Sequence, residues 1–307
     1  MRALLVTNPG ATSTTSGTRD VLIHALRSEV DLEVATTHRR GHAAELARQA
    51  RLDGVEVIVA LGGDGTVNEL VNGMLADGVS DKVPALAVVP GGSANVFARA
   101  LGLPNDAIEA TSVLLEALRE RRTRSIGLGK ANDRWFTFCA GLGLDAEIIR
   151  RVERARVRGR TATVALYVRS TFAQYLSGTD RSEPMIRLRR PGGTVVDGLS
   201  MVVVQNTVPW TYFGRHPVTF TDTASFDAGL DLFAMRGLHP SETAVAAAQL
   251  LLMHRKPGGR ATYRLRDQES FMVISRRPLA LQLDGDYVGE SDEVTFESHP
   301  NAVRVVL

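Results

Sequence analysis

Apolar and polar positions divide the 307-residue chain into two parts with different patterns. From Arg2 to about Leu118, short β-branched runs alternate with stretches of helical pattern. The runs predict strands at residues 3–6, 32–36, 55–61 and 86–89, and the stretches between them predict helices at 20–29, 42–51, 66–76 and 94–101. Strands that alternate with helices are typical of a parallel sheet covered by helices. The first part is therefore predicted to be an α/β domain with a parallel sheet.

After Arg121 the pattern becomes a series of extended segments, at residues 135–140, 185–189, 199–205, 217–221, 230–235 and 271–274. Such a series predicts a mostly antiparallel β domain. Two long helical patterns interrupt it, at 145–176 and 240–253. We expect the α/β domain to span residues 1–122 and the β domain residues 123–292. A last strand, about residues 293–307, is expected to return to the first domain.

Composition places the chain among ordinary globular proteins, because 44% of its residues are hydrophobic and 23% are charged. No stretch approaches the ~18 apolar residues of a bilayer span, and the start lacks a signal-peptide core. Neither zinc spacing nor an RNA-binding aromatic signature is present, so no nucleic-acid partner is expected. The single cysteine, Cys139, is predicted to be a buried thiol. These features favour a cytoplasmic protein, with peripheral contact at the inner membrane face as an option.

Six arginines fall within eleven residues and give the chain its densest run of positive charge. They are Arg150, Arg151, Arg154, Arg156, Arg158 and Arg160. The run is compatible with a solvated helix face. It is also compatible with contact to an anionic membrane surface, where each basic residue contributes ~1 kcal/mol. The sequence leaves both interpretations open.

A glycine-rich turn, Gly62-Gly63-Asp64-Gly65-Thr66, joins the strand at 55–61 to an amphipathic helix. Glycines let the main chain approach a polyphosphate, and the helix start offers unpaired N–H groups with a partial positive charge. A second strand, glycine turn and helix follow at residues 88–99. We expect the two turns to face one crevice and bind phosphate without a lysine. For a single glycine turn, a tight strand-to-helix connection without any ligand would be the alternative.

The segment Gly62-Gly63-Asp64-Gly65-Thr66-Val67-Asn68-Glu69, followed by Pro90-Gly91-Gly92-Ser93-Ala94-Asn95, resembles the diacylglycerol kinase catalytic-domain family. Bacterial lipid kinases and sphingosine kinases belong to that family. The likeness extends to Asn8-Pro9, to residues 37–43 and to residues 142–146, which open the second domain. The fold implied is of the NAD kinase and diacylglycerol kinase type.

The resemblance implies ATP and Mg²⁺ as cofactors. The nucleotide-binding residues that it implies are Asn8, Thr37, Gly62, Gly63, Asp64, Gly65, Thr66, Val67, Asn68, Glu69, Gly91, Gly92, Ser93 and Asn95. Asp64 would belong to the magnesium and phosphate network, Asn8 and Asn95 would fix the loops, and Glu69 could cap or brace the turn. Ser93 stands where many relatives have threonine and keeps the hydroxyl donor.

The catalytic candidates are Asp284 and Asp286, in the sequence Asp284-Gly285-Asp286. The family usually has Asp-Gly-Glu there, and its carboxylates are taken to accept the proton of the lipid hydroxyl. Asp286 occupies the usual glutamate position and is one methylene shorter. Either the loop lies closer to the substrate, or Asp284 takes the larger share of the work. Asp-Gly between β-rich flanks also predicts a hairpin turn, and both interpretations can hold.

A third acidic segment, residues 224–232, resembles the magnesium site of bacterial members, which an aspartate and neighbouring carbonyls form. It implies Asp227, Leu230 and Asp231 as metal-site residues, since oxygen ligands suit Mg²⁺. Relatives place the aspartate directly before the glycine, whereas Ala228 intervenes here. Ordinary turn formation is therefore an equally weighted alternative.

The resemblance implies an ATP-dependent lipid kinase, with diacylglycerol as the expected acceptor at a membrane surface and the reaction between the two domains. A homo-oligomer is compatible with the sequence. Residues 210–214 would border the acceptor cleft or pack in the core. An NAD kinase is a rival that shares the glycine turn, but Asn68-Glu69 follows that turn directly here, as in lipid kinases. A non-catalytic nucleotide- or lipid-binding regulator stays open because of Asp286 and the segment around Asp227.

Overall fold

The structure is a computed structural model that describes residues 1–9, 15–157, 170, 173–174, 185–251, 253 and 255–307. The chain divides into two compact units. The first unit comprises Met1–Leu128 and Pro300–Leu307, and the second comprises Gly129–His299. Most of the predicted helix beyond residue 157 lies outside the described residues, together with Arg158 and Arg160 of the basic run.

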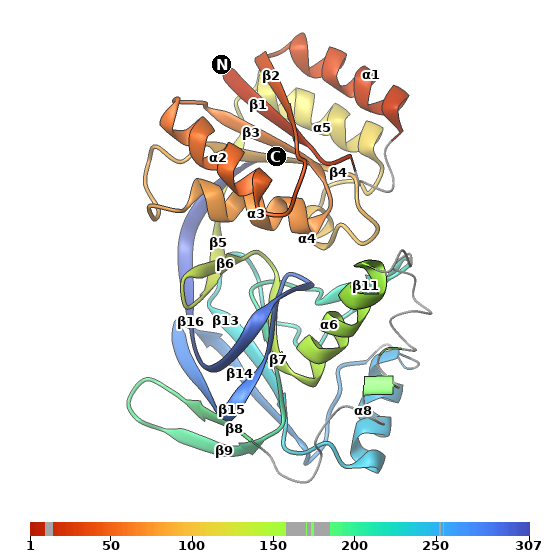
Figure 1. The fold of residues 1–307 in the computed structure, drawn as a ribbon, viewed down its shortest axis with the longest axis vertical. Helices are drawn as coiled ribbons and strands as arrows, with labels where there is room; N and C mark the ends of the chain where they lie inside the picture. Colours follow the sequence, from red (N-terminus) through yellow and green to blue (C-terminus); the bar gives the residue numbers. More distant parts are fainter. Residues whose placement is uncertain (10–14, 158–169, 171–172, 175–184, 252, 254) are drawn as a thin grey trace. The chain divides into compact units, whose positions relative to one another are not determined.

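The first unit is a parallel sheet covered by helices, as the sequence predicted (Figure 1). Its strands, in the order β16-β4-β3-β1-β2, are the end of β16 (Asp286–Val306), β4 (Ala85–Pro90), β3 (Val57–Gly62), β1 (Arg2–Thr7) and β2 (Asp31–Thr36). Its helices are α1 (Ser16–Arg27), α2 (His42–Leu52), α3 (Asp64–Met74), α4 (Val96–Ala100) and α5 (Ala107–Arg119). Every residue of β3 and β4 is buried, as expected for central strands that are covered on both faces.

Alternate strand positions pack against different helices. Leu5, Val59 and Ala87 belong to one cluster with Leu26 of α1 and Leu114 of α5. The opposite face carries α2 and α3, which pack closely together. The parallel strands end at the same edge, because Thr7 is the register partner of both Thr36 and Leu61, and Gly62 is the partner of Pro90. Loops that follow these strands therefore lie beside one another.

The second unit is mostly antiparallel β structure, which confirms the predicted fold class. Its elements are β5 (Thr123–Ala131), which begins in the first unit, β6 (Arg134–Phe136), β7 (Cys139–Gly143), α6 (Leu144–Val157), β8 (Ile186–Arg189), β9 (Val195–Leu199), β10 (Met201–Gln205), β11 (Thr211–Phe213), β12 (His216–Val218), β13 (Leu230–Met235), α8 (Pro240–Leu251), β14 (Thr262–Gln268) and β15 (Ser270–Leu283). The main strand order is β14-β13-β10-β7-β15-β16, with β8 on β15 and β9 on β8. In the part of the chain that the structure describes, no helix is both long and apolar enough to span a membrane.

The strand predicted at residues 135–140 is two strands, β6 and β7, that pair with different neighbours. The break falls at Thr137 and Phe138, whose backbone N–H groups donate to the carboxylate of Asp284 at 2.7 and 2.9 Å. A side chain thus takes amides that a continuous strand would use in its ladder. Cys139 follows this break and is a buried free thiol, as predicted.

The second unit buries one carboxyl group with an unusual pKa. Asp145 lies in the first turn of α6 and is 5% exposed. Its Oδ2 accepts a hydrogen bond from Nε2 of Gln282 at 2.9 Å. Burial raises the pKa of Asp145 from 3.8 to about 6, although the Gln282 hydrogen bond acts in the opposite direction.

This raised pKa predicts that Asp145 contributes less to the stability of the protein as the pH rises. Between pH 4 and pH 6 the Asp145 carboxyl ionises in the unfolded state but stays protonated in the folded state. Ionisation therefore stabilises the unfolded state and lowers the free energy of unfolding by about 3 kcal/mol in all. Asp145→Asn removes this difference. Urea unfolding from pH 4 to pH 7 should therefore show the variant gaining about that amount relative to the wild type. Parallel curves for the two proteins would contradict the prediction, and the exposed Asp292→Asn serves as control.

Candidate functional site

The two glycine turns of the first unit contact each other through their main chains. Gly63 is the N-cap of α3 and has an extended backbone, with φ −91° and ψ −177°. The Gly91 N–H donates to the carbonyl of Gly62 at 2.9 Å. A Cβ on Gly92 would lie 2.7 Å from Cα of Gly63, so a side chain at Gly92 would push the turns apart. The two turns therefore form one backbone surface at the carboxyl edge of the sheet.

Asp64 ties the first turn to the helix that follows the second. Its Oδ2 accepts from the Val96 N–H and its Oδ1 from the Phe97 N–H, both at 3.0 Å. These amides are the first two of α4, whose N-cap Asn95 makes no side-chain cap bond. Asp64 therefore caps α4 from a distant part of the sequence. This contact is what holds the position of Asp64, which the sequence assigned to a magnesium and phosphate network.

Asn95 stabilises the second turn from inside. Its Oδ1 accepts from the Gly92 N–H at 2.8 Å, and its Nδ2 donates to the Gly92 carbonyl at 2.9 Å. Asn95 has φ 48°, in the left-handed region that asparagine tolerates better than most residues. The predicted role of Asn95 in fixing the loop agrees with these bonds. Ser93, between the two, is exposed.

Residues from the ends of β1 and β2 adjoin the first turn. Nδ2 of Asn8 donates to Oγ1 of Thr66 at 3.3 Å, and the Asn8 N–H donates to the Leu61 carbonyl at 3.3 Å. The Thr37 N–H donates to the Thr7 carbonyl at 2.9 Å. Asn8 is exposed, whereas Thr37 and Thr66 are buried. The structure thus brings residues from four strand ends together at one edge of the parallel sheet.

Glu69 and Asn68, which the sequence placed in the nucleotide site, make hydrogen bonds to helix residues. Oε1 of Glu69 accepts from the Gly41 N–H at 2.8 Å, and Oε2 accepts from the Ala43 N–H at 3.2 Å. Glu69 therefore caps α2, whose N-cap residue Gly41 has no side chain to do so. Asn68 is buried, and its Oδ1 accepts from Nδ2 of Asn72 at 3.1 Å. Glu69 thus joins α3 to the start of α2, and the Asn68 bond lies within α3.

The two catalytic candidates occupy a two-residue hairpin between β15 and β16. Asp284 and Gly285 have φ of 51° and 81°, and Leu283 pairs with Asp286. Positive φ at both central positions is the type I′ geometry, so the predicted turn is present. Asp284 is 4% exposed, and its carboxylate accepts from the N–H groups of Thr137, Phe138 and Cys139 and from Oγ1 of Thr137, at 2.7–3.1 Å. Asp286 is only partly buried.

Gln282 connects this turn to the buried Asp145. Its Nε2 donates to Asp145 and its Oε1 accepts from the Gly285 N–H at 2.9 Å. No role was predicted for Gln282 from the sequence, and Asp145 entered the sequence analysis only as a member of the motif at residues 142–146. A polar residue between Leu281 and Leu283 of a buried strand was the available signal, because a buried amide requires partners.

The predicted metal segment is largely bonded to the protein itself. Asp231 is 1% exposed, and its oxygens accept from Oγ1 of Thr223 at 2.5 Å and from the Asp267 N–H at 2.9 Å. The Gly229 N–H donates to Oδ1 of Asp267 at 2.7 Å. Asp227 is exposed and Leu230 is buried. These contacts fit a closed turn better than a Mg²⁺ site. Within the described residues, no group of three or more His, Cys, Asp or Glu side chains could hold a metal ion.

Other predicted features take structural positions. Trp210 packs edge-to-face on Phe220, with ring centroids 5.1 Å apart, in a core cluster. Nη1 of Arg150, from the basic run, lies 2.6 Å from Oε1 of Glu290, and Nη1 of Arg151 donates to Gln174 at 3.4 Å.

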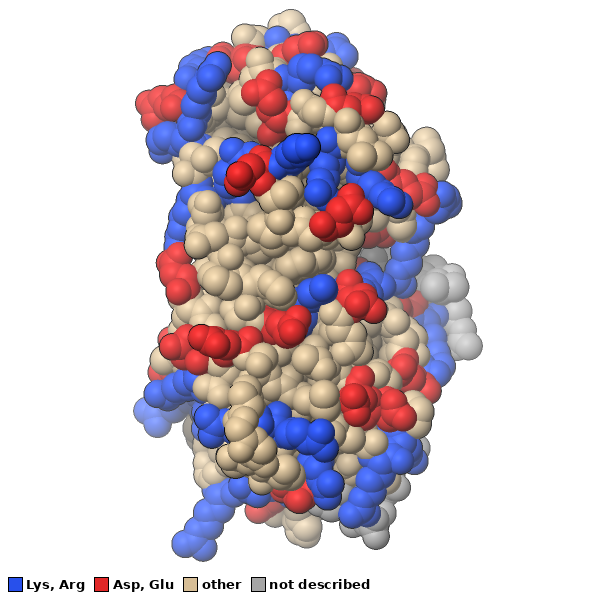
Figure 2. All heavy atoms as spheres, turned by 90° about the vertical axis from the view of Figure 1, so that its left-hand side faces the viewer, with Lys and Arg blue, Asp and Glu red and all other residues tan. Residues whose placement is uncertain are grey.

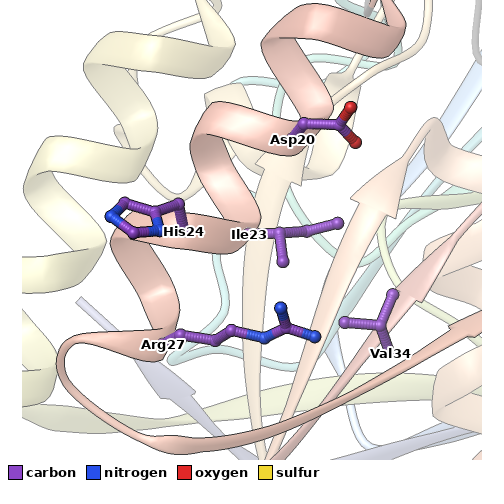
Figure 3. A pocket seen from close by; sticks show the side chains of 5 residues that line it. All are labelled: Asp20, Ile23, His24, Arg27 and Val34. Carbon is purple, nitrogen blue, oxygen red and sulfur yellow. The ribbon is translucent and has the colours of Figure 1, made fainter.

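A hollow beside α1 and β2 is lined by Asp20, Ile23, His24, Arg27 and Val34 (Figure 3). None of the nucleotide-site candidates belongs to that hollow, in which Arg27 extends toward Val34 while His24 points to the other side.

Comparison with known proteins places these features in a family context. Residues 2–131 match the diacylglycerol kinase catalytic domain. A protein of Chromohalobacter salexigens named "Probable lipid kinase YegS-like" is 41% identical over 117 residues, 38% of this chain and 36% of that protein. A diacylglycerol kinase of Staphylococcus haemolyticus is 32% identical over 159 residues, 52% of this chain and 43% of that protein. The matches thus span less than half the length of these curated relatives.

The whole chain shares its fold with a solved structure. A crystal structure of a diacylglycerol kinase from Bacillus anthracis covers 99% of this chain and 96% of its own, with a TM-score of 0.72 and 19% identity. That likeness extends the shared fold over both units, whereas the matched catalytic domain ends at residue 131. The resemblance expected from the glycine turns is confirmed, because residues 2–131 match the diacylglycerol kinase catalytic domain.

Proposed function

We propose that this protein is an ATP-dependent lipid kinase that transfers the γ-phosphate of ATP to a lipid hydroxyl, with diacylglycerol as the acceptor and phosphatidic acid as the product. The observation that carries the proposal is the pair of glycine turns in main-chain contact at the carboxyl edge of the parallel sheet. In such sheets, ligands bind outside the carboxyl ends of the strands, next to the point where the strand order reverses. Here that point is between β1 and β3.

The nucleotide would bind as its magnesium complex along the backbone surface of the two turns. Gly63 and Gly92 have no side chains there, so phosphate oxygens could approach main-chain N–H groups closely. The Thr66 and Ser93 hydroxyls would supply further donors. Because both oxygens of Asp64 already accept amide hydrogens, Asp64 would act on the nucleotide mainly by holding the turns together. Residues 227–231 fit a metal poorly, so no step depends on them.

The acid residues divide into one that builds the turn and one that acts on the acceptor. Four hydrogen bonds occupy the carboxylate of Asp284, which would hold the turn in place. Asp286 would accept the proton of the lipid hydroxyl as the hydroxyl oxygen bonds to the γ-phosphorus and the bond from that phosphorus to the β,γ-bridging oxygen breaks. ADP leaves with the electrons of the broken bond.

A methyl group at Gly92 should weaken nucleotide binding. Gly92→Ala places Cβ against Cα of Gly63 and close to Oδ1 of Asn95, so the turns must separate. We expect the Kd for ATP to rise at least about tenfold, which corresponds to about 1.4 kcal/mol of lost binding free energy. Titration calorimetry measures it. Gly258→Ala, which meets no atom within 4 Å, is the matched control, and equal affinities for the two variants would refute the proposed binding surface.

Asp286→Asn should abolish most transfer and leave ATP binding intact. Loss of a general base costs about 10²–10⁴ in kcat. Purified protein would be incubated with labelled ATP and Mg²⁺, in parallel with diacylglycerol micelles, sphingosine or NAD. Label in phosphatidic acid supports the proposal, whereas label in NADP, or in no acceptor despite ATP binding, rejects it. Asp292→Asn, an exposed change on the same strand, is the control, and wild-type turnover in Asp286→Asn would exclude Asp286 as the base.

A further inference from the structure

Strand pairing in the second unit gathers arginines that lie far apart in the sequence. β8 pairs with β15, with Arg187 opposite Ile274 and Arg189 opposite Met272. The Arg276 N–H donates to the carbonyl of Met185 at 3.2 Å, which places Arg276 at the start of β8. Residues 185–199 and 274–278 together contain five arginines and one aspartate. We call this region the hairpin surface; its charged residues are Arg187, Arg189, Arg190, Asp197, Arg276 and Arg277.

The arginines of the hairpin surface face outward. Ile186 and Leu188 of β8 are buried in the core, whereas the alternate residues Arg187 and Arg189 are exposed. Arg276 and Arg277 are exposed as well. Val195, opposite Arg189 on β9, is 44% exposed and adds an apolar residue to the rim. Basic side chains gather on the lower part of the face in Figure 2, where Figure 1 places the β8–β9 hairpin.

A hollow opens within this surface. Its lining includes Arg187, Asp197, Ile274, Ser275 and Arg276. Arg187 and Arg276 bring guanidinium groups to this lining, and their N–H groups are donors suited to a phosphate.

Asp197, the single carboxylate of the hairpin surface, competes weakly with a phosphate for Arg187. Oδ1 of Asp197 lies 2.5 Å from Nε of Arg187, and both side chains are more than half exposed. An exposed ion pair of this kind adds little to stability, so a phosphate could replace Asp197 as the partner of Arg187. The acidic border lies on the next strand, where Glu293 of β16 pairs with Ile274.

In the basic run noted in the sequence, the first arginine is already paired with a carboxylate. Arg150 pairs with Glu290 at 2.6 Å and lies over the ring of Tyr287 at 5.2 Å. Arg151 and Arg154 are exposed on α6. The basic run on α6 and the hairpin surface are thus two candidates for membrane contact. Of these, the hairpin surface carries more arginines within its described residues.

We propose that the hairpin surface docks onto a bilayer that contains anionic phospholipids, with a lipid headgroup phosphate seated in the hollow between β8, β9 and β15. Arginine suits this role because its planar guanidinium binds phosphate oxygens in pairs. Each arginine near an anionic surface adds to the attraction, and salt weakens it. Docking of this kind requires no ATP and does not depend on the proposed kinase activity.

The test measures co-sedimentation of the full chain, without ATP, with vesicles of phosphatidylcholine alone or mixed with phosphatidylglycerol. Arg189→Gln/Arg190→Gln should lower the partition coefficient on the mixed vesicles by about 30-fold. Asp197→Asn should raise it by about fivefold, because the competing carboxylate is lost. Arg27→Gln/Arg48→Gln, which removes the same charge from the first unit, should bind like the wild type.

Each other outcome overturns the proposal. An equal loss in Arg27→Gln/Arg48→Gln would show a response to net charge alone. A loss confined to Arg151→Gln/Arg154→Gln would place the contact on α6. Unchanged or weaker binding of Asp197→Asn would contradict the binding of a headgroup phosphate in the hollow. Equal binding to both vesicle types would show that docking does not depend on anionic lipid. The substituted side chains are exposed, apart from the partly buried Arg190, and matching urea midpoints confirm that the variants are folded.

Discussion

The bond between Asp64 and the start of α4 is the contact on which the glycine-turn site depends. Helix α4 has only five residues, so most of its N–H groups lack partners within the helix. Asp64 satisfies two of them and thereby fixes the second turn against the first. The approach of Gly63 to Gly92 follows from that bond. Removal of the Asp64 carboxylate would therefore disturb the shape of the site as well as its charge, and a loss of activity would not by itself identify a metal ligand.

The second unit uses a carboxylate in the same way. Asp284 gathers three consecutive amides from residues 137–139 and so breaks one predicted strand into β6 and β7. Its left-handed backbone also forms the tight turn that ends with Asp286. Gln282 accepts a hydrogen bond from the Gly285 N–H in that turn and donates one to the buried Asp145. The position of Asp286 is thus set by neighbours whose own side chains are engaged in hydrogen bonds.

Much of the fold could be predicted from the sequence, because its signals are local. Apolar runs at 55–61 and 86–89 mark central strands, and glycines directly after them mark turns at the carboxyl edge. The partners of polar side chains could not be predicted in this way. Asp64 bonds residues 32 and 33 positions away, and Asp284 bonds residues about 145 positions away. A carboxylate in a motif looks the same in the sequence whether it binds a ligand or caps a helix.

The clustering of charged side chains also could not be predicted from the sequence. The run from Arg150 to Arg160 is conspicuous in the sequence, yet Glu290 from a distant strand pairs with its first member. The arginines of the hairpin surface are separated by almost ninety positions, and only the pairing of β8 with β15 brings them together. Phosphate transfer would then rely on backbone N–H groups, while attraction to a membrane would rely on guanidinium groups on separate elements. Because the two tasks use different residues, substitutions in the hairpin surface should alter lipid binding without changing the affinity for ATP.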